Sequence, residues 1–444
     1  MNSCRFNPDI VRICLTFVCL LWLGAVITWA AADHYVVPTN ASASSPFTDW
    51  GSAATNIQHA VNAAVDGETV WITNGTYFCQ EIYTNISGTT TSTAMVVITN
   101  SITVSSFNGQ YSNTIVNGYY PAWTTRVFLV DNTGAVVSGL TITNGFSTSL
   151  SGVGVRMYNG NLLTNCLITG NVLTNDTGSA LCAGIHMTSG TISRCIINGN
   201  KALGTNSSCS QIAALYCAGG GGTITNCQIS WNSIGRGTSY GDTCWLAYGY
   251  YRMQDCVVHN NSAYYAIQMG ANFVGWCAIS NNSSTGVWLG EGSILRNCLI
   301  VTNGGYGVGI GRWGGELRNC TIAGHTVRGI EATECAGSSK YSIENNIIYY
   351  NVLNWYSTNL FYTNCCTDPL PTLGTNNIAN TPLFVNNNAG NWRLSANSPC
   401  INRGTNQTWM TNSVDLDGSA RIRYGKVDIG AYEHINKGTV YNFQ

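Results

Sequence analysis

Three residues with side chains suited to acid–base chemistry stand close together late in the chain: His325, Arg328 and Glu331. An imidazole can act as a general base, a guanidinium can hold the carboxylate of a uronate sugar, and a carboxyl can act as an acid. Such a set would suit a polysaccharide lyase, and the region around His186 is a second place for its base. A structural or binding role is the simpler interpretation, because surface charge pairs are often inert.

A second group of side chains follows one short strand of a repeat. Alternate residues of a strand face opposite sides, so one position should face outward in every copy. That position holds Arg156, His186, Tyr216, Ala247, Gln268, Trp288, Gly309 and Glu331. A flat row of aromatic and charged groups suits a polysaccharide, which presents apolar sugar faces and many hydroxyls. Arg312 is a further substrate-binding candidate, and ordinary variety on a solvent-facing strand is the alternative.

Carboxylates are too few for two familiar chemistries. A calcium-dependent lyase needs several on the strand face, where the outward position offers only Glu331. A glycoside hydrolase needs two or three around the scissile bond, and no pair recurs at neighbouring positions. Asp415 and Asp417 lie in a D-x-D-G sequence, part of a calcium loop whose other ligands are missing. We expect no cofactor, and calcium bound at this sequence is the alternative. The expected role of this sequence is to form a turn and to pair with Arg421 or Arg423.

Gly309, Gly311 and Gly314 form a G-x-G-x-x-G sequence. A dinucleotide-binding loop of this pattern follows a strand and opens a helix. Here the sequence continues as GELRNC, which leads into another repeat strand. We therefore expect these glycines at bends and expect no nucleotide.

The elements that would position these side chains are copies of one short repeat. The copies are NCLITGN (165–171), RCIINGN (194–200), NCQISWN (226–232), DCVVHNN (255–261), WCAISNN (276–282), NCLIVTN (297–303), NCTIAGH (319–325) and NNIIYYN (345–351). Aliphatic residues or Met stand three before and two after the Cys position, and Asn, or His325, stands five after it. Stacked copies would form apolar columns and a ladder of Asn side chains, which is the pattern of a parallel β-helix.

Seven of the 19 cysteines occupy one inward column of this repeat. Stacked side chains would be about 4.8 Å apart, more than the Cβ separation of about 3.5–4.5 Å in a disulfide. We expect buried, reduced thiols there. Cys365, Cys366 and Cys400 lie outside the column and could pair.

Composition limits the partners. Charged residues make up 9% of the 444 residues and the net charge is −1, so electrostatics favours neither nucleic acid nor an anionic membrane. Arg5 and Arg12, an apolar run and Ala30-Ala31-Ala32 predict a signal peptide at 1–32, with a retained anchor as the alternative. We expect a secreted or cell-surface monomer without a membrane span after cleavage.

Both ends differ from the repeat. TNIQHAVNAAV (55–65) predicts a short helix with Thr55 as N-cap and Ile57, Ala60, Val61 and Ala64 on one side. TPLFVNNNAGNWRLSANSPCINRG (381–404) and DLDGSARIRYGKVDIGAYEH (415–434) predict a C-terminal cap. At these residues the chain resembles bacterial exported right-handed parallel β-helix proteins of the pectate-lyase-like superfamily. Its C-terminal part resembles the region called choice-of-anchor Q. The resemblance implies fold and export but no settled activity.

The sequence therefore predicts an all-β chain, a right-handed parallel β-helix (solenoid) with a capping helix and a wrap-around C-terminal cap. The expected parts are a signal peptide (1–32), a cap and first coil (33–95), repeats (96–365) and a C-terminal capping region (366–444). The predicted function is binding of a polysaccharide or cell-surface glycan without demonstrated catalysis. A polysaccharide lyase and a structural adhesion rod are the alternatives.

Overall fold

The computed structural model describes residues 32–435, except 88–89, 120–121, 175–180, 205–210, 236–240, 248–249, 313–314, 333–340 and 358. The described residues from Asp33 onward form one compact unit. The predicted signal peptide, apart from Ala32, lies outside the described residues, and so does Gly314. None of the described helices is long and apolar enough to cross a membrane.

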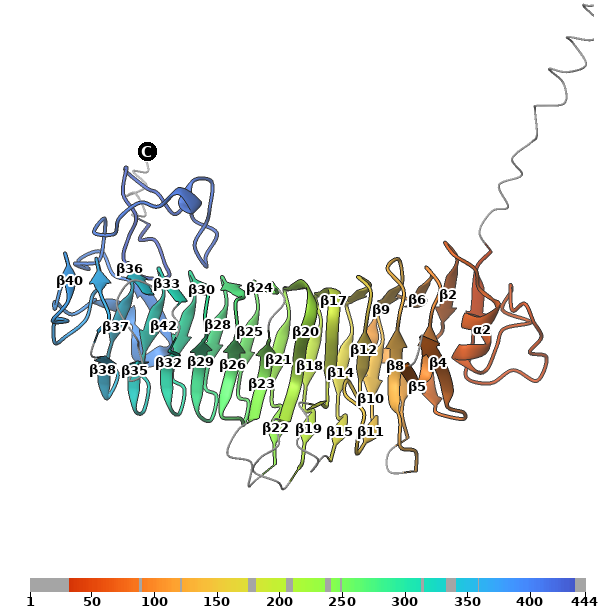
Figure 1. The fold of residues 1–444 in the computed structure, drawn as a ribbon. Coiled ribbons are helices and arrows are strands. Elements are labelled where there is room, and N and C mark those ends of the chain that lie inside the picture. The colour runs from red at the N-terminus through yellow and green to blue at the C-terminus, as the bar shows by residue number, and fades with distance from the viewer. Residues whose placement is uncertain are drawn as a thin grey trace, which may run out of the picture. The chain divides into compact units, whose positions relative to one another are not determined.

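The unit is a stack of coils, and successive coils pair their strands in parallel along three series (Figure 1). The first series contains β5 (Thr90–Ile98), β8 (Arg126–Val130), β12 (Val155–Met157), β17 (Ile185–Ser193), β20 (Gln211–Thr225), β23 (Gly241–Leu246), β26 (Tyr265–Met269), β29 (Thr285–Leu289), β32 (Tyr306–Ile310), β35 (Arg328–Ala332) and β38 (Leu353–Ser357). The long strands β17 and β20 run on into the second series and join the two.

The second series contains β1 (His34–Val36), β2 (Thr69–Ile72), β6 (Thr103–Ser106), β9 (Val136–Ser138), β13 (Leu162–Thr164), β24 (Arg252–Gln254), β27 (Phe273–Gly275), β30 (Ser293–Arg296), β33 (Gly315–Arg318), β36 (Tyr341–Glu344), β39 (Tyr362–Thr363) and β40 (Gly374–Thr375). The third contains β3 (Gly75–Phe78), β7 (Thr114–Asn117), β10 (Thr141–Thr143), β14 (Leu167–Thr169), β18 (Ile196–Asn198), β21 (Gln228–Ser230), β25 (Val257–His259), β28 (Ala278–Ser280), β31 (Leu299–Val301), β34 (Thr321–Ala323) and β37 (Ile347–Tyr349). A short extra sheet is formed by β11 (Phe146–Ser147), β15 (Val172–Leu173), β19 (Lys201–Ala202) and β22 (Ser233–Ile234).

The inward columns predicted from the repeat are confirmed. The seven cysteines and the apolar residues three before and two after them are buried. All fourteen described cysteines are buried and free, including Cys365, Cys366 and Cys400. The residue before each repeat cysteine has a left-handed backbone, with φ of 51° at Asn165 and 54° at Asp255, which Asn and Asp tolerate better than other non-glycine residues. This bend turns the chain from the second series into the third.

A ladder of polar side chains also lies inside the coils, at the position five residues after each repeat cysteine. In this Asn ladder the Nδ2 of every member except the last, Asn303, donates to the Oδ1 of the next coil's Asn at 2.9–3.0 Å. It also donates to a backbone carbonyl of the preceding coil. The members are Asn171, Asn200, Asn232, Asn261, Asn282 and Asn303. The ladder supplies the hydrogen bonds that buried backbone groups at a bend require.

Helix α2 (Ile57–Ala63) packs beside the first coils, and its predicted apolar side is buried. Its N-cap is Asn56 and not Thr55, because the Asn56 side chain accepts the hydrogen bond from Gln58 N. Gln58 then binds both the N–H and the C=O of Val97, which fixes the helix to β5. Strand β4 (Tyr83–Ser87) forms an antiparallel hairpin with β5.

The C-terminal segment packs on the outer side of the third series, with β41 (Phe384–Asn386) and β42 (Asn391–Leu394) as a hairpin. Its Trp392 and Tyr432 cover Val301 and Ala323. Short 3-10 turns occur at Tyr111–Asn113, Asn387–Ala389 and Thr408–Met410.

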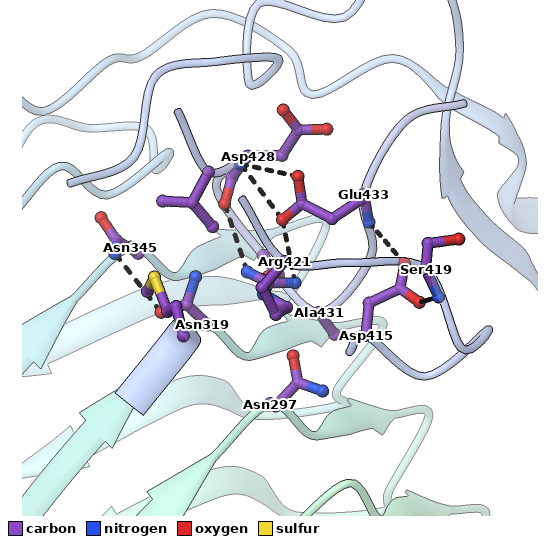
Figure 2. A network of polar contacts seen from close by, with 12 residues as sticks. Asn297, Asn319, Asn345, Asp415, Ser419, Arg421, Asp428, Ala431 and Glu433 are labelled. Carbon is purple, nitrogen blue, oxygen red and sulfur yellow. Dashed lines mark hydrogen bonds and ion pairs between the residues drawn. The ribbon is translucent and has the colours of Figure 1, made fainter. Parts of the chain in front are cut away.

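Arg421 is fully buried at the centre of this segment, among three carboxylates (Figure 2). Its Nη1 lies 3.2 Å from Glu433 Oε1, and Asp415 and Asp428 are the other acids near it. Burial raises the pKa of Glu433 to about 8, against the opposing effect of Arg421. Burial also raises the pKa of Asp428, against hydrogen bonds from the backbone of His434 and Asn402.

Candidate ligand-binding face

Strand pairing lines up one outward position of the first series from coil to coil. This surface column consists of Arg156, His186, Tyr216, Trp245, Gln268, Trp288, Gly309, Glu331 and Tyr356. The prediction that Ala247 belongs to this column is wrong. Strand β23 ends at Leu246, so Ala247 lies beyond it and is buried, and Trp245 takes the outward place. Tyr356 extends the column by one coil.

The aromatic members of the surface column touch one another. The His186 and Tyr216 ring centroids are 4.4 Å apart, and those of Tyr216 and Trp245 are 5.3 Å apart. All three rings are half-buried, so each keeps part of its face toward solvent. On the other side of Gln268, the Trp288 ring lies 5.3 Å from that of Tyr265. The column therefore presents two aromatic patches with an amide between them.

Gly309 lies within strand β32 and not at a bend, so the expectation for this glycine is wrong. A Cβ placed on Gly309 would stand 2.5 Å from Cε3 of Trp288, and one on Gly311 would be 3.4 Å from its Nε1. The missing side chain at Gly309 therefore makes room for the indole. At Gly311 a side-chain carbon would meet the indole at an ordinary contact distance, so this role belongs to Gly309.

The three catalytic candidates do not form one site. Arg328 Nη1 pairs with Glu331 Oε2, and the guanidinium lies 4.4 Å from the Tyr356 ring centroid. The hydrogen bond to Glu331 raises the pKa of Arg328. Glu331 is buried and Arg328 is half-buried, so both charges are used in this pair.

His325 lies inside the coil and belongs to the Asn ladder. Its Nδ1 accepts from Asn303 N at 3.2 Å, and its Nε2 lies 3.0 Å from Ile300 O. The side chain is 2% exposed, and burial lowers its pKa to about 4. Both ring nitrogens are therefore occupied inside the coil, and this position argues against the candidate role of His325 as a general base.

A basic cluster that the sequence did not reveal stands at the N-terminal end of the surface column. It consists of Arg126 on β8, Arg156 on β12 and His186 on β17. Arg156 stacks on Tyr158 at 4.3 Å, and His186 Nδ1 lies 2.7 Å from Ser151 Oγ. Burial, and then the charges of Arg156 and Arg126, hold the pKa of His186 well below its usual value. Its imidazole is therefore neutral at pH 7. Arg126 was missed because it precedes the repeat copies.

The remaining candidates lie apart from these groups. Gln268 is half-buried between Trp245 and Trp288, and Arg312 is exposed in the turn after β32. Asp417 pairs bidentately with Arg393, at 2.5 and 2.6 Å, and not with Arg421 or Arg423. Asp415 accepts backbone hydrogen bonds from Asp417, Ser419 and Glu433. Within the described residues no group of three His, Cys, Asp or Glu side chains is arranged to hold a metal.

Two pockets lie away from the surface column. One of about 500 Å³ is lined mainly by amides and hydroxyls of α2, β4 and β5, and one of about 350 Å³ lies beside Trp231. None of the predicted site residues lines either pocket. The candidate face is therefore the strand surface itself.

Comparisons with known proteins agree with this architecture. The model of the family described as right handed beta helix region matches residues 213–390. A crystal structure of pectate lyase Pel9A shares 16% identity with a TM-score of 0.54, covering 91% of this chain and 96% of that chain. A rhamnogalacturonan lyase shares 12% identity, with a TM-score of 0.45 and coverages of 72% and 87%. No curated protein sequence matches. The family model and the pectate lyase structure confirm the predicted fold, a right-handed parallel β-helix. A shared fold at such low identity shows no activity for this chain.

Proposed function

We propose that this protein binds a polysaccharide along the surface column. The observation that carries the proposal is the pair of aromatic patches, His186–Tyr216–Trp245 and Tyr265–Trp288, on adjacent coils. Rings on a flat strand surface can stack on apolar sugar faces while polar neighbours bind hydroxyls. The similar fold of a pectate lyase is consistent with such a ligand.

The same proposal places the protein outside the cell. Its support is the signal-peptide pattern at residues 1–32 and the resemblance of the C-terminal segment to choice-of-anchor Q regions. A secreted or surface-attached chain would meet glycans there.

A polysaccharide lyase is the second candidate function, and a neutral imidazole beside two guanidiniums is the observation that favours it. In such a β-elimination, His186 would take the C5 proton of a uronate, the C4–O bond would break, and a C4=C5 double bond would form. The leaving oxygen would receive a proton. Absorbance of unsaturated uronates, lost in His186→Ala, would support this function, and its absence on every uronate polymer would contradict it.

Affinity gel electrophoresis of the purified protein with neutral and uronate polysaccharides tests the binding proposal. Trp245→Ala and Trp288→Ala should each weaken retardation about tenfold, or about 1.4 kcal/mol, because each removes a stacking ring. Trp231→Ala is the matched control, since Trp231 is exposed at a bend outside the column. Equal losses in all three variants, or no binding to any polymer, would contradict the proposal and leave a structural rod.

A further inference from the structure

We propose that Arg126, Arg156 and His186 form a subsite for a single oxyanion carried on a sugar, so that the polysaccharide is an acidic one. The oxyanion is a carboxylate or a sulfate ester. This inference rests on the proposed function and names the class of its ligand.

Arg126 is a buried cation with no counter-ion among the residues that the structure describes. Its side chain is 4% exposed, and its Nε and Nη1 have no hydrogen-bond partner in the described part of the chain. Burial lowers its pKa to about 10, so the guanidinium remains charged at neutral pH. A buried charge without a partner costs several kcal/mol, and buried polar groups are normally paired with protein, water or an ion.

Arg156, from the next coil, adds a second unmatched charge. Its Nη1 is also buried without a partner, and among the described residues neither arginine forms an ion pair. Strand β8, which carries Arg126, pairs in parallel with β12, which carries Arg156, so the two guanidiniums come from neighbouring strands, and repulsion by Arg156 lowers the pKa of Arg126. A ligand oxyanion would relieve this repulsion and could accept hydrogen bonds from both side chains.

His186 connects this cluster to the aromatic part of the surface column. Ser151 holds its Nδ1, and its ring lies against Tyr216, which in turn lies against Trp245. A sugar whose acidic group reaches the arginines would place its ring, or that of the next sugar, over these aromatic side chains. The same polymer could then occupy both the subsite and the rest of the column.

The test measures binding of four polymers: polygalacturonate, its carboxyl-reduced form, dextran sulfate and dextran. Arg156→Gln and Arg126→Gln should weaken binding of an acidic polymer at least tenfold and leave neutral polymers unaffected. Preference for polygalacturonate would identify a carboxylate, and preference for dextran sulfate a sulfate ester. Arg252→Gln, which changes an exposed arginine outside the column, should bind as the unaltered protein does.

Thermal unfolding separates binding from folding. Arg126→Gln should keep or raise the melting temperature, because it removes an unpaired buried charge. Unchanged binding of acidic polymers by both arginine variants would overturn the subsite, while losses in the tryptophan variants would still support polysaccharide binding. Stabilisation by inorganic phosphate or sulfate, with no preference for acidic polymers, would also overturn it. Failure of every polymer to bind would reject the proposed function itself.

Discussion

Substitutions of His325 can distinguish a structural role of this residue from a catalytic one. The imidazole does the work that Asn does in other coils: Nδ1 accepts from Asn303 N where an Asn would use Oδ1, and Nε2 serves Ile300 O where an Asn would use Nδ2. Since Nδ1 accepts, the hydrogen bonds assign the proton to Nε2. His325→Asn should therefore restore the Asn ladder and cost less than about 1.5 kcal/mol, mainly through lost volume.

His325→Ala should cost far more. It leaves a buried N–H on Asn303 and a buried C=O on Ile300, each worth about 1–3 kcal/mol when unsatisfied. We take about 4 kcal/mol for the two groups together. For a unit of about 400 residues, the unfolding entropy near the midpoint is about 0.8 kcal/mol/K, so cooperative unfolding would occur about 5 °C lower.

The pH dependence provides a second, independent measurement. The folded-state pKa of His325 is about 4, below its unfolded value of about 6.5, so the unfolded chain binds the proton first as pH falls. Its contribution to stability is full above about pH 6.5 and is lost progressively down to about pH 4, a change of about 3 kcal/mol. His325→Asn should remove this part of the pH dependence.

Melting temperatures at pH 7.5 and pH 4.5, followed by circular dichroism, would measure both effects. His59→Asn, which changes an exposed histidine of α2, is the matched control and should leave the pH dependence as it is. If His325→Asn destabilises the protein as much as His325→Ala, the ladder role is refuted. Loss of a glycan-cleaving activity in a fully stable His325→Asn protein would refute it as well.

Two further changes test other parts of the structure. Gly309→Ala places a Cβ 2.5 Å from the Trp288 ring, so the indole must move; we expect altered tryptophan fluorescence and several-fold weaker glycan binding, whereas Gly292→Ala, at a turn with more space, should affect neither property beyond a small loss of stability. Unchanged fluorescence in Gly309→Ala would contradict the contact. Glu433→Gln tests the buried carboxylates: the raised folded pKa of about 8 means that the contribution of Glu433 is full below about pH 4.5 and is lost as pH rises through 8. Hydrogen exchange of the C-terminal segment should therefore accelerate toward pH 9 beyond the intrinsic rate in the unaltered protein and much less in the variant; equal acceleration in both would show that another group titrates.

The interior of the fold could be predicted from sequence because every coil imposes the same demand there. An inward position must be filled by an apolar side chain of similar size, and a buried bend must satisfy its backbone groups. The Ile column and the Asn ladder repeat for this reason. The repeat pattern also places His325 at the Asn-ladder position. The catalytic hypothesis for His325 rested on the chemistry of an imidazole and not on that buried position.

The outer face was less predictable because neighbouring coils do not have to share a residue type there. Trp245 was missed since the β20–β23 pairing contains an irregularity between Ile212 and Leu215, close to a long insertion between repeats. Arg126 was missed because it precedes the first repeat copy and matches no motif. Such residues become visible only when strand pairing sets the register.

Gly309 shows how a surface feature is built by two coils together. The glycine by itself suggests a bend, and Trp288 by itself suggests an isolated exposed ring. The two residues are paired across β29 and β32, and the space left by the missing side chain of Gly309 is filled by the Trp288 ring. Because neighbouring strands are only about 4.8 Å apart, a large ring on this face needs a small or stacking neighbour. Tyr216 and Trp245 meet that need by stacking, and Trp288 meets it with Gly309 and Tyr265. The aromatic patches are therefore properties of neighbouring coils, so substitutions that test glycan binding should be made in pairs across a coil boundary as well as singly.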